Sequence, residues 1–171
     1  YIEFYHNEFF KNPSANIAKE YLKKRGLTAE EVKNFKIGFV TNEMDFFEHI
    51  SSEFDENTLK NSGLFYLDEK KKKYVERFRD RIIFPINNIS GQPIGLGGRT
   101  IQENNYSAKY INSPETLFFK KGSNLYKLDL ARKLSNKIDH VYLVEGYMDV
   151  IGLSKNGIEN VVANLGTSLT N

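Results

Sequence analysis

The sequence predicts a mixed α+β and α/β protein, in which a helical and antiparallel-β part is followed by a truncated parallel βαβ sheet. Three observations support this fold class. Apolar residues at helical spacing fill the first third, alternating segments flank turns in the middle, and two short apolar runs enclose a helix at the end. The chain is therefore expected to change architecture twice along its length.

The first third is predicted to be helical. Aromatic residues over 1–10 recur at helical spacing, which favours a stripe facing the core. Ser14 is expected to cap a second helix over 15–24. Thr28 and Glu31 have the spacing of a capping box and predict a third helix. Further short helices are expected over 45–51 and 56–61.

The middle of the chain is predicted to be antiparallel β-structure. Two hairpins are expected, one formed by 64–67 and 74–78 and the other by 81–86 and 93–100. The glycines of GLGGRT are expected to allow another group close to the strand backbone, because the segment lacks both phosphate-loop spacing and a following helix. Strand alternation places three guanidinium groups on one surface. These belong to Arg77, Arg79 and Arg81.

The last third predicts a parallel βαβ unit. The apolar runs HVYLVEG and NVVANLG flank YMDVIGLSKNG, whose apolar residues have helical spacing. A two-stranded parallel sheet is too small to be stable alone. We therefore expect either that this chain is a fragment of a larger domain or that strands from earlier in the chain complete the sheet.

The composition excludes several classes of protein. The 171 residues include no cysteine, which rules out a disulfide scaffold, a thiolate zinc site and a cysteine nucleophile. No apolar stretch approaches the roughly 18 residues that a membrane span needs. The net charge of +2 is unevenly distributed, since residues 69–139 contain 15 basic and 7 acidic side chains. A basic centre of this kind is compatible with a nucleic-acid partner or with an ordinary solvated surface.

Glu145 and Asp149 are the first candidate site. Glu145 ends an apolar strand just before a helix, where open α/β sheets bind ligands, and Asp149 follows one helical turn later. Paired carboxylates suit Mg²⁺, which is often shared with substrate phosphates. The same pattern is also typical of a polar strand end followed by an acid that the helix dipole favours.

The segment 99–121 is the second candidate site. It interleaves basic groups with aromatic residues, a combination that can hold phosphates and stack bases. Ser113 precedes Pro114 and predicts a helix start there. A surface loop with ordinary lysines remains the alternative interpretation.

Several motifs together resemble one family. RFRDRIIFPI, GQPIGLGGR, KYINSPET, FKKG, LYKL, VEGYMDV and LGTSLT follow one another in the order typical of the RNA-polymerase core of bacterial DnaG-type DNA primases. The upstream motifs YLKKRGL and KIGFV are also similar to that family, so the resemblance covers nearly the whole chain. It implies an N-terminal subdomain over 1–125 and the beginning of a Toprim subdomain over 126–171.

The resemblance also implies roles for individual residues. Glu145 corresponds to the family's catalytic, metal-associated acid, and Asp149 to its supporting acid, with Mg²⁺ or Mn²⁺ as the expected metal. A groove for nucleic acid and nucleotide is implied at nine positions. These are Arg25, Arg77, Arg79, Arg81, Arg99, Lys109, Tyr110, Asn112 and Lys121.

The family makes short RNA primers on single-stranded DNA from nucleoside triphosphates, in the cytoplasm at the replication fork. The resemblance implies that a zinc domain precedes this segment and a helicase-binding domain follows it, and that the chain ends before a second acidic Asp-x-Asp motif. We therefore expect this piece to bind nucleic acid, and metal at most weakly, without making primers by itself. A non-catalytic single-strand-binding module and another Toprim enzyme, a topoisomerase or nuclease, are the alternatives.

Overall fold

The computed structural model describes residues 1–43, 45–102, 107–134 and 136–166. Its strands form a four-stranded antiparallel sheet in the order β1-β4-β5-β6, a β2-β3 hairpin and a parallel β7-β8 pair. The strands are β1 (Gly38–Val40), β2 (Phe65–Asp68), β3 (Lys73–Glu76), β4 (Arg81–Asn87), β5 (Pro93–Thr100), β6 (Tyr110–Asn112), β7 (Tyr142–Val144) and β8 (Val161–Ala163). The predicted fold class is confirmed, with helices and an antiparallel sheet followed by a parallel βαβ unit.

The helices are short, and three of the described α-helices begin at a residue whose side chain caps the helix. The helices are α1 (Ile2–Lys11), α2 (Asn16–Lys24), α3 (Ala29–Asn34), α4 (Phe46–Ile50), α5 (Glu56–Asn61), α6 (Leu128–Ala131) and α7 (Tyr147–Ser154), with 3-10 turns at η1 (Pro13–Ala15), η2 (Lys121–Ser123) and η3 (Arg132–Leu134). The predicted capping box of Thr28 and Glu31 is present at α3. The prediction for Ser14 is wrong, because α2 begins after Ala15 without a side-chain cap, and Asn12 instead caps the preceding turn η1 by accepting from the Ser14 amide.

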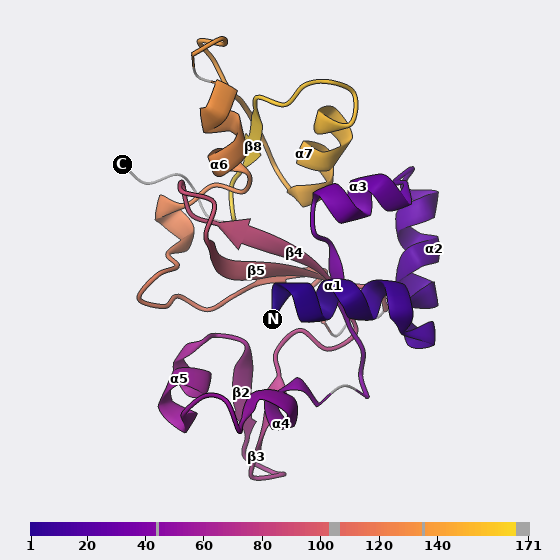
Figure 1. Cartoon of the computed structure of the whole chain (residues 1–171), viewed down its shortest axis with the longest axis vertical. Coiled ribbons are helices and arrows are strands. Elements are labelled where there is room, and N and C mark those ends of the chain that lie inside the picture. The colour runs from indigo at the N-terminus through magenta and orange to yellow at the C-terminus, as the bar shows by residue number, and fades with distance from the viewer. Residues whose placement is uncertain (44, 103–106, 135, 167–171) are drawn as a thin grey trace.

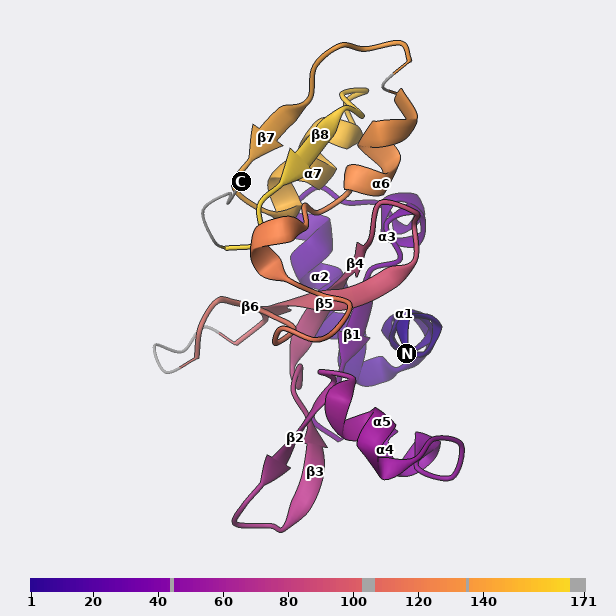
Figure 2. The same ribbon diagram turned by 90° about the vertical axis from the view of Figure 1, so that its left-hand side faces the viewer.

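The four-stranded sheet forms the middle of the molecule (Figure 1). β4 is a central strand of this sheet, since it pairs with β1 over Arg81–Ile83 and with β5 along its length. Pro85 lies beyond the stretch that pairs with β1, so its missing amide hydrogen costs no bond on that side. Helix α1 packs on β1, while β6 forms the opposite edge of the sheet (Figure 2).

The parallel unit packs against this body through a shared core. Val150 and Ile151 of α7 and Val161 of β8 are fully buried and belong to the same apolar cluster as Phe84 of β4. A β-bridge from Tyr126 to Ala163 also ties the segment before α6 to β8. Figure 2 shows the unit above the sheet and the β2-β3 hairpin below it. No helix in the described ranges combines the length and the apolar character that a membrane span requires.

Candidate functional site

A cavity of about 720 Å³ lies where the sheet edge meets the parallel unit. Its walls come from β6, the end of α2, the segment after β3, the start of α7 and the segment after β8. Seven of the residues predicted from the sequence line this cavity. They are Arg25, Arg77, Tyr110, Asn112, Lys121, Glu145 and Asp149. Residues that are far apart in the sequence therefore meet around one space.

The acidic wall consists of Glu145 and Asp149. Glu145 directly follows β7, and Asp149 lies in the first turn of α7, where the helix dipole favours a negative charge. Both side chains are exposed and both line the cavity. Asp149 Oδ2 would lie 3.6 Å from a Cβ built on Gly146, so this carboxylate lies close to the backbone at the helix start. The local strand-to-helix connection is sufficient to bring the two acids to the same opening.

Carboxylate oxygens are the donor type that Mg²⁺ prefers, and this ion is often held by one or two carboxylates together with water and substrate phosphates. Glu145 and Asp149 fit that requirement. Among the described residues, no group of three or more histidines and acids that could hold a metal is found. The acidic wall therefore has the donors of a site shared with a substrate, not those of a closed protein cage.

The basic wall consists of Arg25, Arg77 and Lys121. Arg25 is exposed at the end of α2, while Arg77 and Lys121 are partly buried after β3 and at η2. The Arg77 amide donates to the carbonyl of Leu64, which continues the pairing of the hairpin beyond β3. Three separate segments thus place positive charge around the cavity that the two carboxylates also line, in a form suited to phosphate groups.

Arg99 contacts two aromatic residues next to the basic wall. Its guanidinium carbon lies 3.9 Å from the ring centroid of Tyr21 and 5.7 Å from that of Tyr110, so it is placed between two aromatic rings. Burial raises the pKa of Tyr110, which keeps its hydroxyl protonated. Arg99 does not line the cavity itself. The geometry therefore makes it a positioning residue for Tyr110.

Asn112 and Tyr147 join the two sides of the cavity. The Tyr147 hydroxyl donates to Asn112 Oδ1 at 2.6 Å, and Asn112 Nδ2 donates to the carbonyl of Leu165 at 2.6 Å. The Tyr147 ring stacks on Phe84 with centroids 4.9 Å apart. A Cβ on Gly97 would lie 2.3 Å from that ring, so the predicted close approach to the GLGG strand is confirmed and its partner is Tyr147.

Seven lining residues were not among the site residues predicted from the sequence, namely Ile111, Gly146, Tyr147, Met148, Asn164, Leu165 and Gly166. Tyr147 lies between the two acids in the motif VEGYMDV, where its spacing alone indicates a core position. Three of the others follow β8, and only the tertiary fold brings them to the cavity. They are Asn164, Leu165 and Gly166. Residues 167–170 of the motif LGTSLT lie outside the described residues.

The prediction that Arg77, Arg79 and Arg81 share one surface is wrong. The segment 77–80 is a turn between β3 and β4, and Asp80 has a φ of 54°, so strand alternation does not apply. Arg79 pairs with the buried carboxylate of Glu76 at 2.7 Å. Arg81 is buried and donates to the carbonyls of Gly98 and Ala108 at 3.3 and 3.0 Å. Only Arg77 reaches the cavity.

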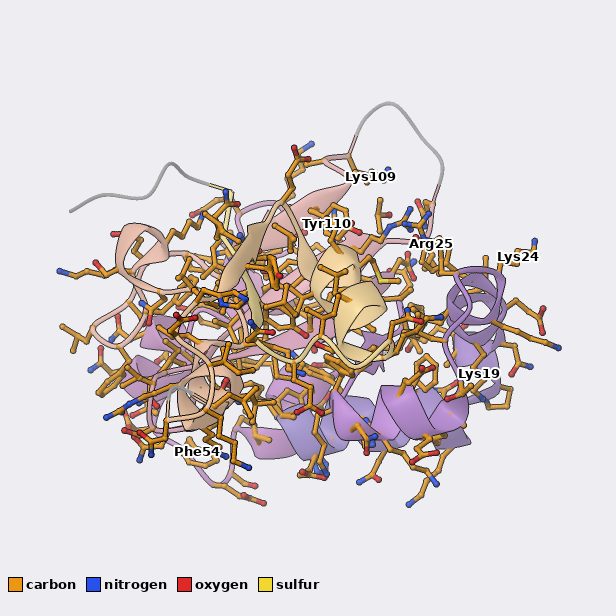
Figure 3. The ribbon with its side chains drawn as sticks, turned by 90° about the horizontal axis from the view of Figure 1, so that it is seen from above. Lys19, Lys24, Arg25, Phe54, Lys109 and Tyr110 are labelled. Atoms are coloured by element: carbon orange, nitrogen blue, oxygen red, sulfur yellow. The ribbon has the colours of Figure 1, made fainter. Side chains whose placement is uncertain are left out.

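Two other predictions concern residues next to β6, namely the helix after Ser113 and the placement of Lys109 in the groove. The predicted helix after Ser113 is absent, because Ser113 is buried and bonds to β5 through both its amide and its hydroxyl. The hydroxyl accepts from the Leu96 amide at 2.9 Å and so cannot act as a helix cap. Lys109 is exposed beside Tyr110 but outside the cavity lining. Figure 3 shows Lys109, Tyr110 and Arg25 along one side of the molecule, away from Phe54.

The chain is similar to known proteins over nearly its whole length. Residues 4–132 match the family model described as DNA primase catalytic core, N-terminal domain, and residues 139–171 match the Toprim domain. It is 46% identical to the DNA primase of Lactococcus lactis over 155 residues, which is 90% of this chain and 24% of that protein. The chain therefore spans about a quarter of the length of this curated relative.

Solved structures agree with this similarity. A DNA primase domain from Pseudomonas aeruginosa is 40% identical and superposes with a TM-score of 0.88, over 99% of this chain and 53% of that one. A DnaG primase catalytic domain described as bound to single-stranded DNA is 38% identical, with a TM-score of 0.85 over 99% of this chain and 52% of that one. Fold, motif order and sequence identity all lead to one assignment: this chain belongs to the family of DNA primase catalytic cores.

Proposed function

We propose that this chain supplies the template groove and part of the catalytic centre for the synthesis of short RNA primers on single-stranded DNA. The observation that carries the proposal is the cavity itself, which is lined both by the basic residues Arg25, Arg77 and Lys121 and by the acids Glu145 and Asp149. A polyanion needs positive groups that bind its phosphates, and a metal-assisted reaction needs acidic groups that hold the metal. Because the chain covers about a quarter of its curated relative, the complete activity is proposed for a longer protein.

The basic wall is proposed to hold the template strand and the triphosphate. Arginine and lysine bind phosphate oxygens through charge-assisted hydrogen bonds, and aromatic rings stack bases with little sequence preference. Tyr110, which contacts Arg99, provides such a ring in the lining of the same cavity. A relative solved in complex with single-stranded DNA supports this assignment. Lys109 is proposed as an outer contact, since it is exposed next to Tyr110.

The acidic wall is proposed to hold Mg²⁺ or Mn²⁺ together with the nucleotide. In primer synthesis a 3′-hydroxyl attacks the α-phosphate of a nucleoside triphosphate and pyrophosphate leaves. A divalent cation held there would lower the pKa of an attacking hydroxyl and neutralise charge on the leaving group. Glu145 is the proposed principal ligand, directly or through water, and Asp149 the supporting one. Lys121 and Arg77 orient the triphosphate from the opposite side.

The remaining assignments follow from the family. We propose a division near residue 125, which the bridge between Tyr126 and Ala163 supports, because it joins the segment after 125 to the Toprim unit. The longer protein is proposed to carry a zinc domain upstream and to contact the replicative helicase through a C-terminal domain. Its proposed location is the cytoplasm, at the replication fork.

The test is Glu145→Ala in a full-length primase that carries this sequence. Loss of a principal metal ligand is expected to lower primer synthesis by about 100-fold or more, while the affinity for single-stranded DNA stays unchanged. Glu159→Ala is the matched control, because Glu159 is exposed before β8, whereas Glu145 lies after β7. Unchanged synthesis by Glu145→Ala would refute the catalytic assignment and favour a single-strand-binding module.

A further inference from the structure

The face of the β2-β3 hairpin that points away from α4 is partly open to solvent, since Tyr66 on it is exposed whereas Val75 is buried. Phe65 points toward the helices, where its ring centroid lies 5.1 Å from that of Phe47 on α4. Tyr66 is the next residue of β2 and pairs across the hairpin with Val75, so both belong to the opposite face. Tyr66 is 45% exposed. The hairpin therefore presents an aromatic ring on the side away from α4 and α5.

This face is continuous with the cavity. The guanidinium carbon of Arg77 lies 5.8 Å from the ring centroid of Tyr66, and Arg77 also lines the cavity. Figure 2 shows β2 on the same side of the molecule as β6, with α4 and α5 on the other side. A strand bound in the cavity can therefore pass Arg77 and reach Tyr66 without crossing the body of the protein.

The tip of the hairpin adds positive charge beyond Tyr66. The four residues Lys70–Lys73 are all exposed there. Asp68 Oδ1 accepts from the amides of Lys70 and Lys71 at 3.0 and 3.1 Å, which holds the turn in a fixed shape. Exposed lysines following an aromatic ring and an arginine match the pattern of single-strand grooves, in which bases stack and phosphates are neutralised.

We propose that the β2-β3 hairpin extends the single-stranded DNA site, with Tyr66 stacking on a base of the strand that leaves the cavity at Arg77 and the lysine tip contacting its phosphates. This inference rests on the proposed function, because it needs a template strand in the cavity. It assigns a binding role to a part of the chain that the cavity lining does not include. The site is expected to be tolerant of sequence, since every base offers a ring face.

The test compares two oligothymidylates, one of about 4 and one of about 12 nucleotides, by fluorescence anisotropy with the 171-residue chain. Tyr66→Ala is expected to raise the Kd for the longer strand about five-fold or more and to leave the shorter one unchanged. Tyr66→Phe keeps the ring and is expected to stay within about two-fold of the unmodified chain. Leu67→Ala is the matched control, since Leu67 is 43% exposed on the other face of the same strand.

The outcomes separate this inference from the proposed function. An unchanged Kd of Tyr66→Ala for the longer strand, or a loss equal to that of Leu67→Ala, would overturn the role of the hairpin. If Lys121→Ala still weakens binding of both strands in that case, the template groove stands and only its extension fails. If Lys121→Ala weakens neither strand, the groove proposal itself is wrong and the extension is overturned with it.

Discussion

The two walls of the cavity are built in different ways. Glu145 and Asp149 lie four residues apart at one strand-to-helix connection, so local backbone geometry fixes their relation. Arg25, Arg77 and Lys121 come from three segments separated by more than 40 residues each, and only tertiary packing brings them together. The acidic wall therefore depends on a single turn of chain, whereas the basic wall depends on the whole fold.

This contrast predicts that substitutions at the contact between the sheet and α7 have the largest effect on the molecule. Gly97→Ala would place a methyl group 2.3 Å from the Tyr147 ring, and we expect it to lower the free energy of unfolding by about 3 kcal/mol. Urea denaturation measures the change. Gly152→Ala on α7 is the control, because nothing lies within 4 Å of its added Cβ. It is expected to stabilise the chain by about 0.5 kcal/mol or more.

Equal stability of the Gly97→Ala chain and the unmodified chain would show that Tyr147 can move away at little cost. The inference that the sheet and α7 are tightly packed at Gly97 and Tyr147 would then be wrong.

Tyr147→Phe tests the same connection more gently. It removes the hydroxyl that donates to Asn112 Oδ1 but keeps the ring that stacks on Phe84. We expect a loss of about 1.5 kcal/mol, because Asn112 Oδ1 is left without this donor. Thermal unfolding measures the loss. Tyr142→Phe is the control, since Tyr142 is 50% exposed on β7, and a comparable loss there would contradict the specific role of the Asn112 bond.

Lys121→Ala is expected to weaken binding of single-stranded DNA about five-fold at low salt. Removal of one phosphate contact should also reduce the slope of log affinity against log salt concentration by about 1. Anisotropy titrations at several salt concentrations measure both quantities. Lys11→Ala at the end of α1 is the matched control, since Lys11 is exposed and is not part of the cavity lining. An unaltered salt slope of Lys121→Ala would exclude this lysine from the groove.

Lys109→Ala is expected to have the smallest effect, a change in Kd of about two-fold. Its side chain is exposed outside the cavity lining, so solvent and salt screen its contribution. The same titrations compare it with Lys121→Ala. A loss that equals or exceeds that of Lys121→Ala would shift the centre of the basic wall toward the start of β6.

The sequence predicts what depends on neighbouring residues. The capping box at Thr28, the β2-β3 hairpin and the meeting of Glu145 with Asp149 all follow from local spacing. Local spacing does not show which residues far apart in the sequence come into contact in the fold. Glu76, the partner of Arg79, is only three residues away, but its burial and its bond from the distant amide of Phe46 become visible only in the fold.

Ser113 shows the same limit at the level of secondary structure. Its position before Pro114 is typical of a helix start, yet its hydroxyl bonds to the amide of Leu96 and holds the end of β6 against β5. Competition from a tertiary hydrogen bond therefore overrides the capping signal. The same reasoning explains Tyr147, whose role becomes visible only when Gly97 and Asn112 are placed beside it.

The central claim is that the basic wall binds the template and that the acidic wall supplies the catalytic carboxylates. The rate of primer synthesis as a function of template concentration tests it most directly, in a full-length primase carrying either Lys121→Ala or Glu145→Ala. We expect Lys121→Ala to raise the template concentration needed for half the maximal rate and nearly to regain the maximal rate at saturation. Glu145→Ala should keep the template dependence and lose the rate at every concentration. A loss of maximal rate in Lys121→Ala together with a normal rate in Glu145→Ala would contradict the account.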